Sequence, residues 1–73
     1  MKTRTLCRAG EALFGPLWQT RFAHALGVND RTIRRWATGE VAIPARVRAE
    51  LVVLAQKRRG DIEEAIRLLT TGE

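Results

Sequence analysis

The chain has 73 residues and carries 13 Lys and Arg against 8 Asp and Glu, which gives a formal net charge of +5. A protein of this length buries only about 60% of the surface that its unfolded chain exposes, so we expect one domain, residues 1–73, with a small core. A single cysteine, Cys7, excludes an internal disulfide, and a single histidine, His24, excludes a histidine metal cluster, so no cofactor and no metal are expected.

A first helix is predicted over residues 5–14. Its inward positions recur at helical spacing and are Leu6, Ala9, Gly10 and Leu13. Gly10 should cost this helix about 1 kcal/mol relative to alanine, unless a neighbouring helix needs the space. Gly15 and Pro16 end the helix, and Trp18 is expected to anchor the core rather than to form a ligand platform.

Residues 19–38 predict two short helices joined by a glycine turn. The apolar side of the first helix is formed by Phe22, Ala23 and Leu26. Gly27 follows, where a helix commonly ends in the left-handed conformation that glycine adopts at little cost. Val28 is expected to point back into the core, and Asn29 is a good N-cap for the second helix.

The second helix of this pair has two contrasting sides. At about 100° per residue, its apolar side holds Ile33, Trp36 and Ala37. Its opposite side holds Arg31, Arg34, Arg35 and Thr38. On an arbitrary helix such arginines are solvated surface, but on the second of two turn-linked helices in a basic chain we interpret them as DNA contacts. Arg31 and Arg35 are expected to bond to the O6 and N7 of guanine.

Asp30 has two interpretations that the residues leave open. Its carboxylate can accept a hydrogen bond from a cytosine amino group, or it can pair with Arg34 one helical turn later.

These residues together resemble a known family. The positions that carry the resemblance are Gln19, Ala23, Leu26-Gly27-Val28, Ile33, Trp36 and Gly39, followed by the run RTIRRWATGE and then IP. They are similar to the lambda-repressor-like (Cro and Xre type) helix-turn-helix DNA-binding domain, in a version common in small bacterial and phage regulators. The resemblance covers roughly residues 13–54.

The resemblance implies a role for particular residues. The base-reading positions would be Asp30, Arg31 and Arg35, although Asp30 lies where neutral hydrogen-bonding side chains are frequent in the family. The contacts to the DNA backbone or the groove edge would come from Gln19, Thr32 and Arg34. Thr38, on the same side of the second helix as the arginines, is also expected to contact the DNA backbone. In this fold the first turn of the following helix approaches the DNA backbone, which would add phosphate contacts from Arg46 and Arg48, with solvated surface as the alternative.

The remainder of the chain predicts scaffold helices. Residues 41–43 are expected to cross back over the core, and Pro44 to begin a helix that ends at about Arg59, with Gly60 closing it. The core side of that helix is Val47, Leu51 and Leu54. Asp61 and Glu64 have capping-box spacing, which predicts a last helix over about residues 62–69. Its buried side would be Ile62, Ala65, Ile66 and Leu69. The expected fold is therefore all-α, a compact bundle of about five short helices containing a helix-turn-helix.

Two features of the C-terminal part indicate a protein contact. Residues 1–59 hold 12 basic and 4 acidic side chains, whereas residues 60–73 hold 1 basic and 4 acidic ones, which suits DNA on one face and a different partner on the other. Three apolar residues point away from the expected core, namely Val52, Val53 and Leu68. Either the helices are covered on several sides, or these residues form a homodimer seam, as two-fold dimers are common among such proteins on DNA.

Other chemistry finds little support in the sequence. Cys7 is expected to act as a small hydrophobe, with an intermolecular disulfide as the alternative, and His24 as surface, with a phosphate contact as the alternative. Glu63 and Glu64 form a helix N-terminal charge pair rather than an acid/base pair, so we expect no enzyme. No signal peptide or membrane-length apolar run is visible, and we expect a cytoplasmic protein, associated with the nucleoid in a prokaryote.

The sequence therefore predicts a sequence-specific, double-stranded-DNA-binding transcriptional regulator of the repressor type. The alternative is a protein-interaction or antitoxin-type helix-turn-helix module with little DNA specificity, which would bind its partner through the acidic C-terminal helix. Such a module has no need of three arginines on the second helix, and its binding should not fall steeply with salt. An RNA-binding role is less favoured because stacking aromatics are missing.

Overall fold

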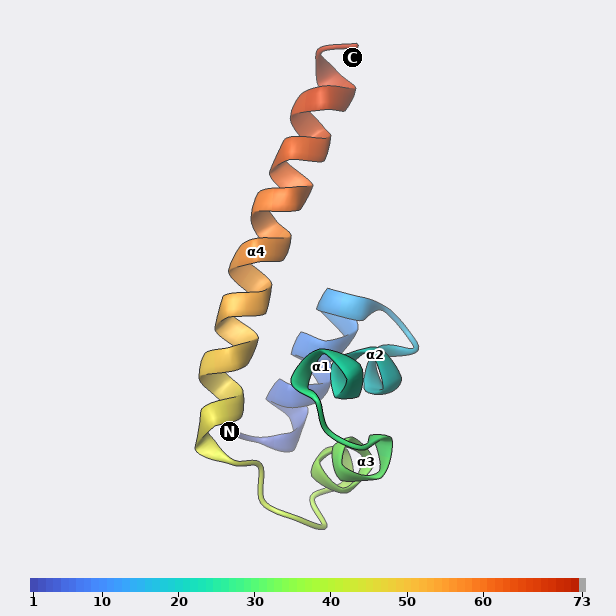
Figure 1. Ribbon diagram of the computed structural model, residues 1–73, viewed down its shortest axis with the longest axis vertical. Coiled ribbons are helices and arrows are strands. Elements are labelled where there is room, and N and C mark those ends of the chain that lie inside the picture. The colour runs from blue at the N-terminus through green and yellow to red at the C-terminus, as the bar shows by residue number, and fades with distance from the viewer. Residues whose placement is uncertain (73) are drawn as a thin grey trace.

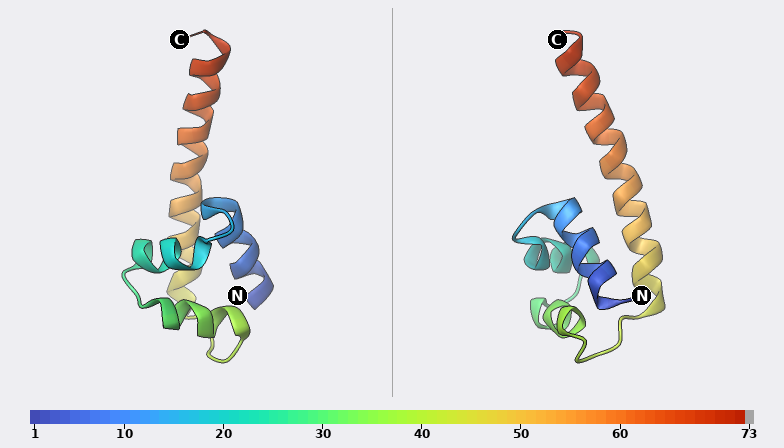
Figure 2. Two further views of the ribbon diagram at one scale, coloured as in Figure 1. Left: turned by 90° about the vertical axis from the view of Figure 1, so that its right-hand side faces the viewer. Right: turned by 180° about the vertical axis from the view of Figure 1, so that it is seen from behind.

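The computed structural model describes residues 1–72, and every regular element in this range is a helix. The helices are α1 (Thr3–Phe14), α2 (Trp18–Leu26), α3 (Asp30–Thr38) and α4 (Ala45–Thr70) (Figure 1). The first three helices and the first half of α4 pack together, while the second half of α4 extends alone beyond them (Figure 2). The molecule is accordingly elongated, with principal extents of 48 × 21 × 21 Å.

All four helices contribute to one apolar core. Its buried members are Leu6 and Leu13 from α1, Trp18, Phe22 and Ala23 from α2, Ile33 and Trp36 from α3, and Val47 and Leu51 from α4. Trp18 was expected to anchor the core and the other residues were expected to face inward from their helical spacing, and both expectations are confirmed. Burial of apolar surface, at roughly 25 cal/mol per Å², is the main force that holds so short a chain together.

The helices α1 and α2 approach each other closely at Gly10 and Trp18. A Cβ atom built on Gly10 would lie only 2.5 Å from Cδ2 of Trp18, so the indole ring occupies the space that a side chain at position 10 would need. The Trp18 ring also packs against Phe22, with 6.2 Å between the ring centroids. The prediction that Trp18 anchors the core is therefore confirmed. A glycine at position 10 destabilises α1, but its missing side chain leaves the space that the Trp18 ring fills.

The sequence-based division of the C-terminal part into two helices is wrong. Gly60 does not close a helix and Asp61 does not cap a new one, because α4 runs without interruption from Ala45 to Thr70. The described part of the chain therefore has four helices rather than five. Pro44 is the N-cap of α4, which begins at Ala45, one residue after its predicted start.

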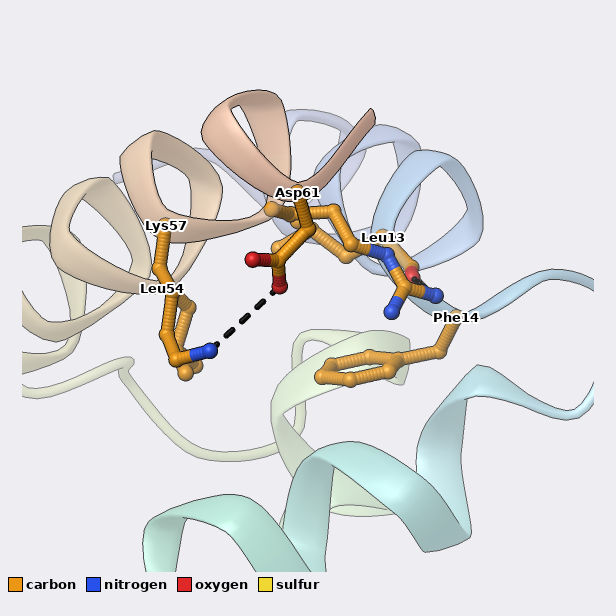
Figure 3. A pocket seen from close by; sticks show the side chains of 6 residues that line it. Leu13, Phe14, Leu54, Lys57 and Asp61 are labelled. Carbon is orange, nitrogen blue, oxygen red and sulfur yellow. Dashed lines mark hydrogen bonds and ion pairs between the residues drawn. The ribbon is translucent and has the colours of Figure 1, made fainter. Parts of the chain in front are cut away.

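Side-chain pairs along α4 give a physical reason for its continuity. Lys57 Nζ lies 3.3 Å from Asp61 Oδ2, one turn apart and on either side of Gly60 (Figure 3). Glu64 and Arg67 form a second ion pair, at 2.6 Å. A glycine destabilises a helix by about 1 kcal/mol relative to alanine without breaking it. Ion pairs between side chains three or four residues apart each stabilise the helix by a few tenths of a kcal/mol.

A contact that the sequence did not predict fixes α4 against α1. The Nη2 group of Arg58 donates a hydrogen bond to the backbone carbonyl of Leu13 at 2.9 Å. The carbonyls of the last turn of a helix have no partner within the helix, so this guanidinium satisfies one of them. Leu54 and Phe14 border a small hollow beside the bond, where Figure 3 places them near Lys57 and Asp61.

Beyond this contact α4 leaves the bundle, and the predicted burial of its last turns is wrong. Ile62, Ile66 and Leu69 are 51%, 54% and 81% exposed, and Ala65 is exposed as well. The last turns of α4 extend beyond the ends of α1, α2 and α3 (Figure 1). The segment of residues 41–43 also differs from expectation, since only Ile43 packs against the core.

The two glycines of the helices give a matched test of these contacts. We expect Gly10→Ala to lower the free energy of unfolding by about 1–3 kcal/mol, because its methyl group overlaps the Trp18 ring. Gly60→Ala should instead raise the helical circular dichroism, because nothing lies within 4 Å of its added Cβ and alanine favours the helix. Urea denaturation followed by tryptophan fluorescence checks the first change. A lower helical signal for Gly60→Ala would contradict a continuous α4.

Candidate nucleic-acid interface

The turn between α2 and α3 sets the relative placement of these two helices. Gly27 is left-handed, with φ 69° and ψ 32°. The N–H of Val28 donates to the carbonyl of Ala23 at 2.9 Å, which folds the chain back against the end of α2. Asn29 then caps α3, since its Oδ1 accepts a hydrogen bond from the Arg31 N–H at 2.8 Å. The predicted roles of Gly27 and Asn29 are confirmed.

The helix α3 separates its apolar and basic residues onto opposite sides. Ile33 and Trp36 are 0% and 3% exposed and face the core. The other side is exposed and lines an open hollow of about 380 Å³ formed by Arg31, Arg34, Arg35, Thr38 and Glu40. We call these five residues the arginine face. Four of the residues that the sequence assigned to DNA contact are therefore neighbours on one surface.

Glu40 is the member of the arginine face that the sequence analysis missed. Its Oε2 lies 3.3 Å from Nε of Arg35, and both side chains are largely exposed. The pair forms because Gly39 is left-handed and returns the chain, so that the Glu40 N–H donates to the Arg35 carbonyl at 3.0 Å. An exposed pair of this kind contributes at most about 1 kcal/mol, so a stronger ligand for Arg35 can displace Glu40.

Asp30 has a partner that neither sequence interpretation named. Its Oδ2 accepts a hydrogen bond from the Thr20 hydroxyl of α2 at 3.2 Å. None of the ion pairs in residues 1–72 joins Asp30 to Arg34. The bond brings the beginning of α2 next to the beginning of α3, and Gln19, which precedes Thr20, lies at the same junction. A carboxylate in the first turn of α3 also interacts favourably with the helix dipole.

Within the arginine face, the Thr38 hydroxyl donates a hydrogen bond to the Arg35 carbonyl at 3.2 Å. Other predicted contacts lie outside this face, and of these Thr32 is half-buried within α3. Arg46 and Arg48 are exposed on the first turn of α4, as expected, but Arg46 pairs with Glu50 at 3.0 Å. In the described residues no hydrogen bond or ion pair links either of these arginines to α3, so the structure does not bring them into the same group.

The contacts of Thr20 and Glu40, which the sequence did not predict, differ in whether a local pattern could have indicated them. Thr20 lies ten positions before Asp30, and no local pattern relates them. Glu40 follows the helix-ending Gly39 directly, so the left-handed turn was a usable signal for its return toward Arg35. His24 is exposed, as expected for a surface residue, and Cys7 is half-buried against the core, as expected for a small hydrophobe.

Comparison with known proteins provides no relative from which the function of this site could be inferred. No protein-family model matches the chain, and no curated protein or solved structure matches it either. Within residues 1–72, no helix is both long and apolar enough to cross a membrane, and no three His, Cys, Asp or Glu side chains are grouped to hold a metal ion. The resemblance to the lambda-repressor-like family therefore remains a prediction.

The cap of α3 can be tested by two substitutions. Asn29→Ala should lower the free energy of unfolding by about 1 kcal/mol, since the side-chain acceptor for the Arg31 N–H is lost. Asn29→Asp keeps an acceptor at the same position and should leave stability nearly unchanged. Urea denaturation of the two variants beside the wild type is the measurement. Equal losses in both variants would contradict the capping role.

Proposed function

We propose that this protein is a sequence-specific, double-stranded-DNA-binding transcriptional regulator of the repressor type, in which α2, the turn and α3 act as a helix-turn-helix. The observation that carries the proposal is the arginine face. Three guanidinium groups gather on the exposed side of a short helix whose other side is buried. An α-helix is about 10–12 Å across with its side chains and the major groove of B-DNA is about 12 Å wide, so α3 fits the groove lengthwise.

We assign a base-reading or a phosphate-contacting role to each residue from the position of its side chain. Arg31 and Arg35 read guanine, because a guanidinium can donate two hydrogen bonds to O6 and N7. Asp30, whose carboxylate also accepts the Thr20 hydrogen bond, is proposed to accept from a cytosine amino group beside them. The sequence-independent contacts to phosphate are assigned to Gln19, Thr32, Arg34, Thr38, Arg46 and Arg48. With a net charge of +5, neutralisation of phosphates supplies most of the affinity.

A second candidate function is supported by a different observation. The exposed apolar residues of the last turns of α4 are typical of a protein contact, as in a protein-interaction or antitoxin-type module. Salt separates the two functions. DNA binding should weaken steeply as salt rises because counterions are released, whereas an apolar contact should not. Neither function requires a cofactor or an enzymatic step.

The proposal is tested by selecting bound sequences from a random duplex pool at physiological salt. The wild type should enrich a short motif containing guanines, and Arg31→Ala/Arg35→Ala should lose or alter it, at a cost of about 1–3 kcal/mol for each base-reading arginine. Arg67→Ala is the control, because it removes one positive charge from the far end of α4. Enrichment of no motif by the wild type would contradict the proposal and favour the interaction module.

The Arg35–Glu40 pair gives a second test, once a binding duplex is known. Glu40→Gln should tighten binding by up to about fivefold, roughly 1 kcal/mol, because Arg35 no longer has to leave an acidic partner. Binding titrations should show a smaller gain when the same change is made in Arg35→Ala, since the two residues act on one contact. An equal gain in both backgrounds would show that Glu40 acts only by repelling phosphate.

A further inference from the structure

The second half of α4 is a helix with an apolar side and nothing in the described chain to cover it. Every residue from Ala55 to Gly72 is exposed, including Ile62, Ile66 and Leu69. The stability of protein helices comes mainly from packing of an apolar side rather than from intrinsic propensity. The projecting turns therefore lack the contact that helices of this composition ordinarily make.

Five apolar residues of α4, with Arg59 among them, follow the spacing of a two-helix seam. Steps of three and four residues alternate along Val52, Ala55, Arg59, Ile62, Ile66 and Leu69. We call this set the α4 stripe. Alternating steps of this kind hold the same side of a helix toward a partner helix. Because α4 is continuous, Val53 and Leu68 each lie about 150° around the helix from the centre of the stripe, so of the three residues proposed for a dimer seam only Val52 belongs to the stripe.

The first half of the stripe borders an open groove between α1 and α4. Two adjoining hollows, of about 300 and 180 Å³, share Ala9, Leu51 and Ala55. The walls of both hollows are chiefly apolar, with Val52 at one end and Ile62 at the other. One α4 thus offers a groove along its first half and an apolar ridge along its second half. A second copy of the chain offers the complementary ridge and groove.

The charges of α4 select the orientation of such a pair. Lys57, Arg58 and Arg59 precede Gly60, and Asp61, Glu63 and Glu64 follow it. A parallel pair would place Arg59 beside Arg59 of the other copy and each charged block beside its like. An antiparallel pair places the basic block opposite the acidic block. Arg59 and Glu63 border the same groove, and no ion pair in the described residues uses either of them.

We propose that two copies of this chain pair through antiparallel α4 stripes. In this register Val52 lies opposite Leu69 of the other copy, Ala55 opposite Ile66, and Arg59 opposite Ile62. The two-fold symmetry makes each contact twice, and the last turns of each α4 enter the α1–α4 groove of the other copy. The pairing goes beyond the proposed DNA binding and does not depend on it, so its tests use the protein alone.

The first test measures the molar mass of the full chain by sedimentation equilibrium. The wild type should reach twice the 8.2 kDa of one chain. Ile66→Asp should weaken the association at least about 100-fold, since the carboxylate would be buried without a partner. Val53→Asp and Leu68→Asp change apolar residues outside the stripe and should leave the association within about threefold of the wild type, as expected for positions that the seam does not bury. Tryptophan fluorescence of Trp18 and Trp36 reports that the bundle of each variant is folded.

The second test determines orientation by disulfide formation in a Cys7→Ser background. Val52→Cys and Leu69→Cys variants, mixed under mild oxidation, should cross-link to each other, and Leu69→Cys alone should not form a disulfide-linked pair. A wild type that stays at 8.2 kDa at the highest attainable concentration would overturn the proposal. Cross-linking of Leu69→Cys to itself would overturn the antiparallel orientation, and loss of association in Leu68→Asp would overturn the stripe.

Discussion

The burial of Ile33 and Trp36 is the constraint on which the rest of the structure depends. These two side chains are 0% and 3% exposed, and they fix the rotation of α3 about its own axis. Once they face the core, the arginines at the intervening positions have to face solvent. The Thr3 hydroxyl approaches the Trp36 carbonyl at 3.4 Å, which adds a polar contact from α1 at the same end of α3. The proposed DNA contact is thus a consequence of core packing.

The features that the sequence predicted correctly are those set by local signals. The bounds of α3 follow from the cap at Asn29 and the left-handed Gly39, and its two sides follow from helical spacing. The continuity of α4 was missed because a glycine and an acidic residue resemble a helix boundary, whereas the Lys57–Asp61 ion pair across Gly60 supports one helix. The bond from Thr20 to Asp30 was missed because it depends on how α2 and α3 meet in space.

The arrangement of the four helices separates two tasks within a short chain. The bundle holds α3 with its arginine face outward, and α4 begins in the core at Val47 and Leu51 and then leaves it. Arg58 marks the change, because it bonds to the end of α1 just before the helix becomes free on all sides. In the proposed pair, the projecting halves would hold two arginine faces in a fixed relation, which is how two-fold regulators read two half-sites of DNA.

Mapping of the backbone amides by nuclear magnetic resonance tests the proposed interface most directly. A uniformly ¹⁵N-labelled chain would be titrated with a mixed-sequence duplex at low and at physiological salt. If the arginine face binds DNA, the largest shift changes should fall on α3 and on the beginning of α2, around Gln19 and Thr20, and should shrink as salt rises. Changes confined to the second half of α4, or no changes at either salt concentration, would contradict the assignment of the arginine face to DNA.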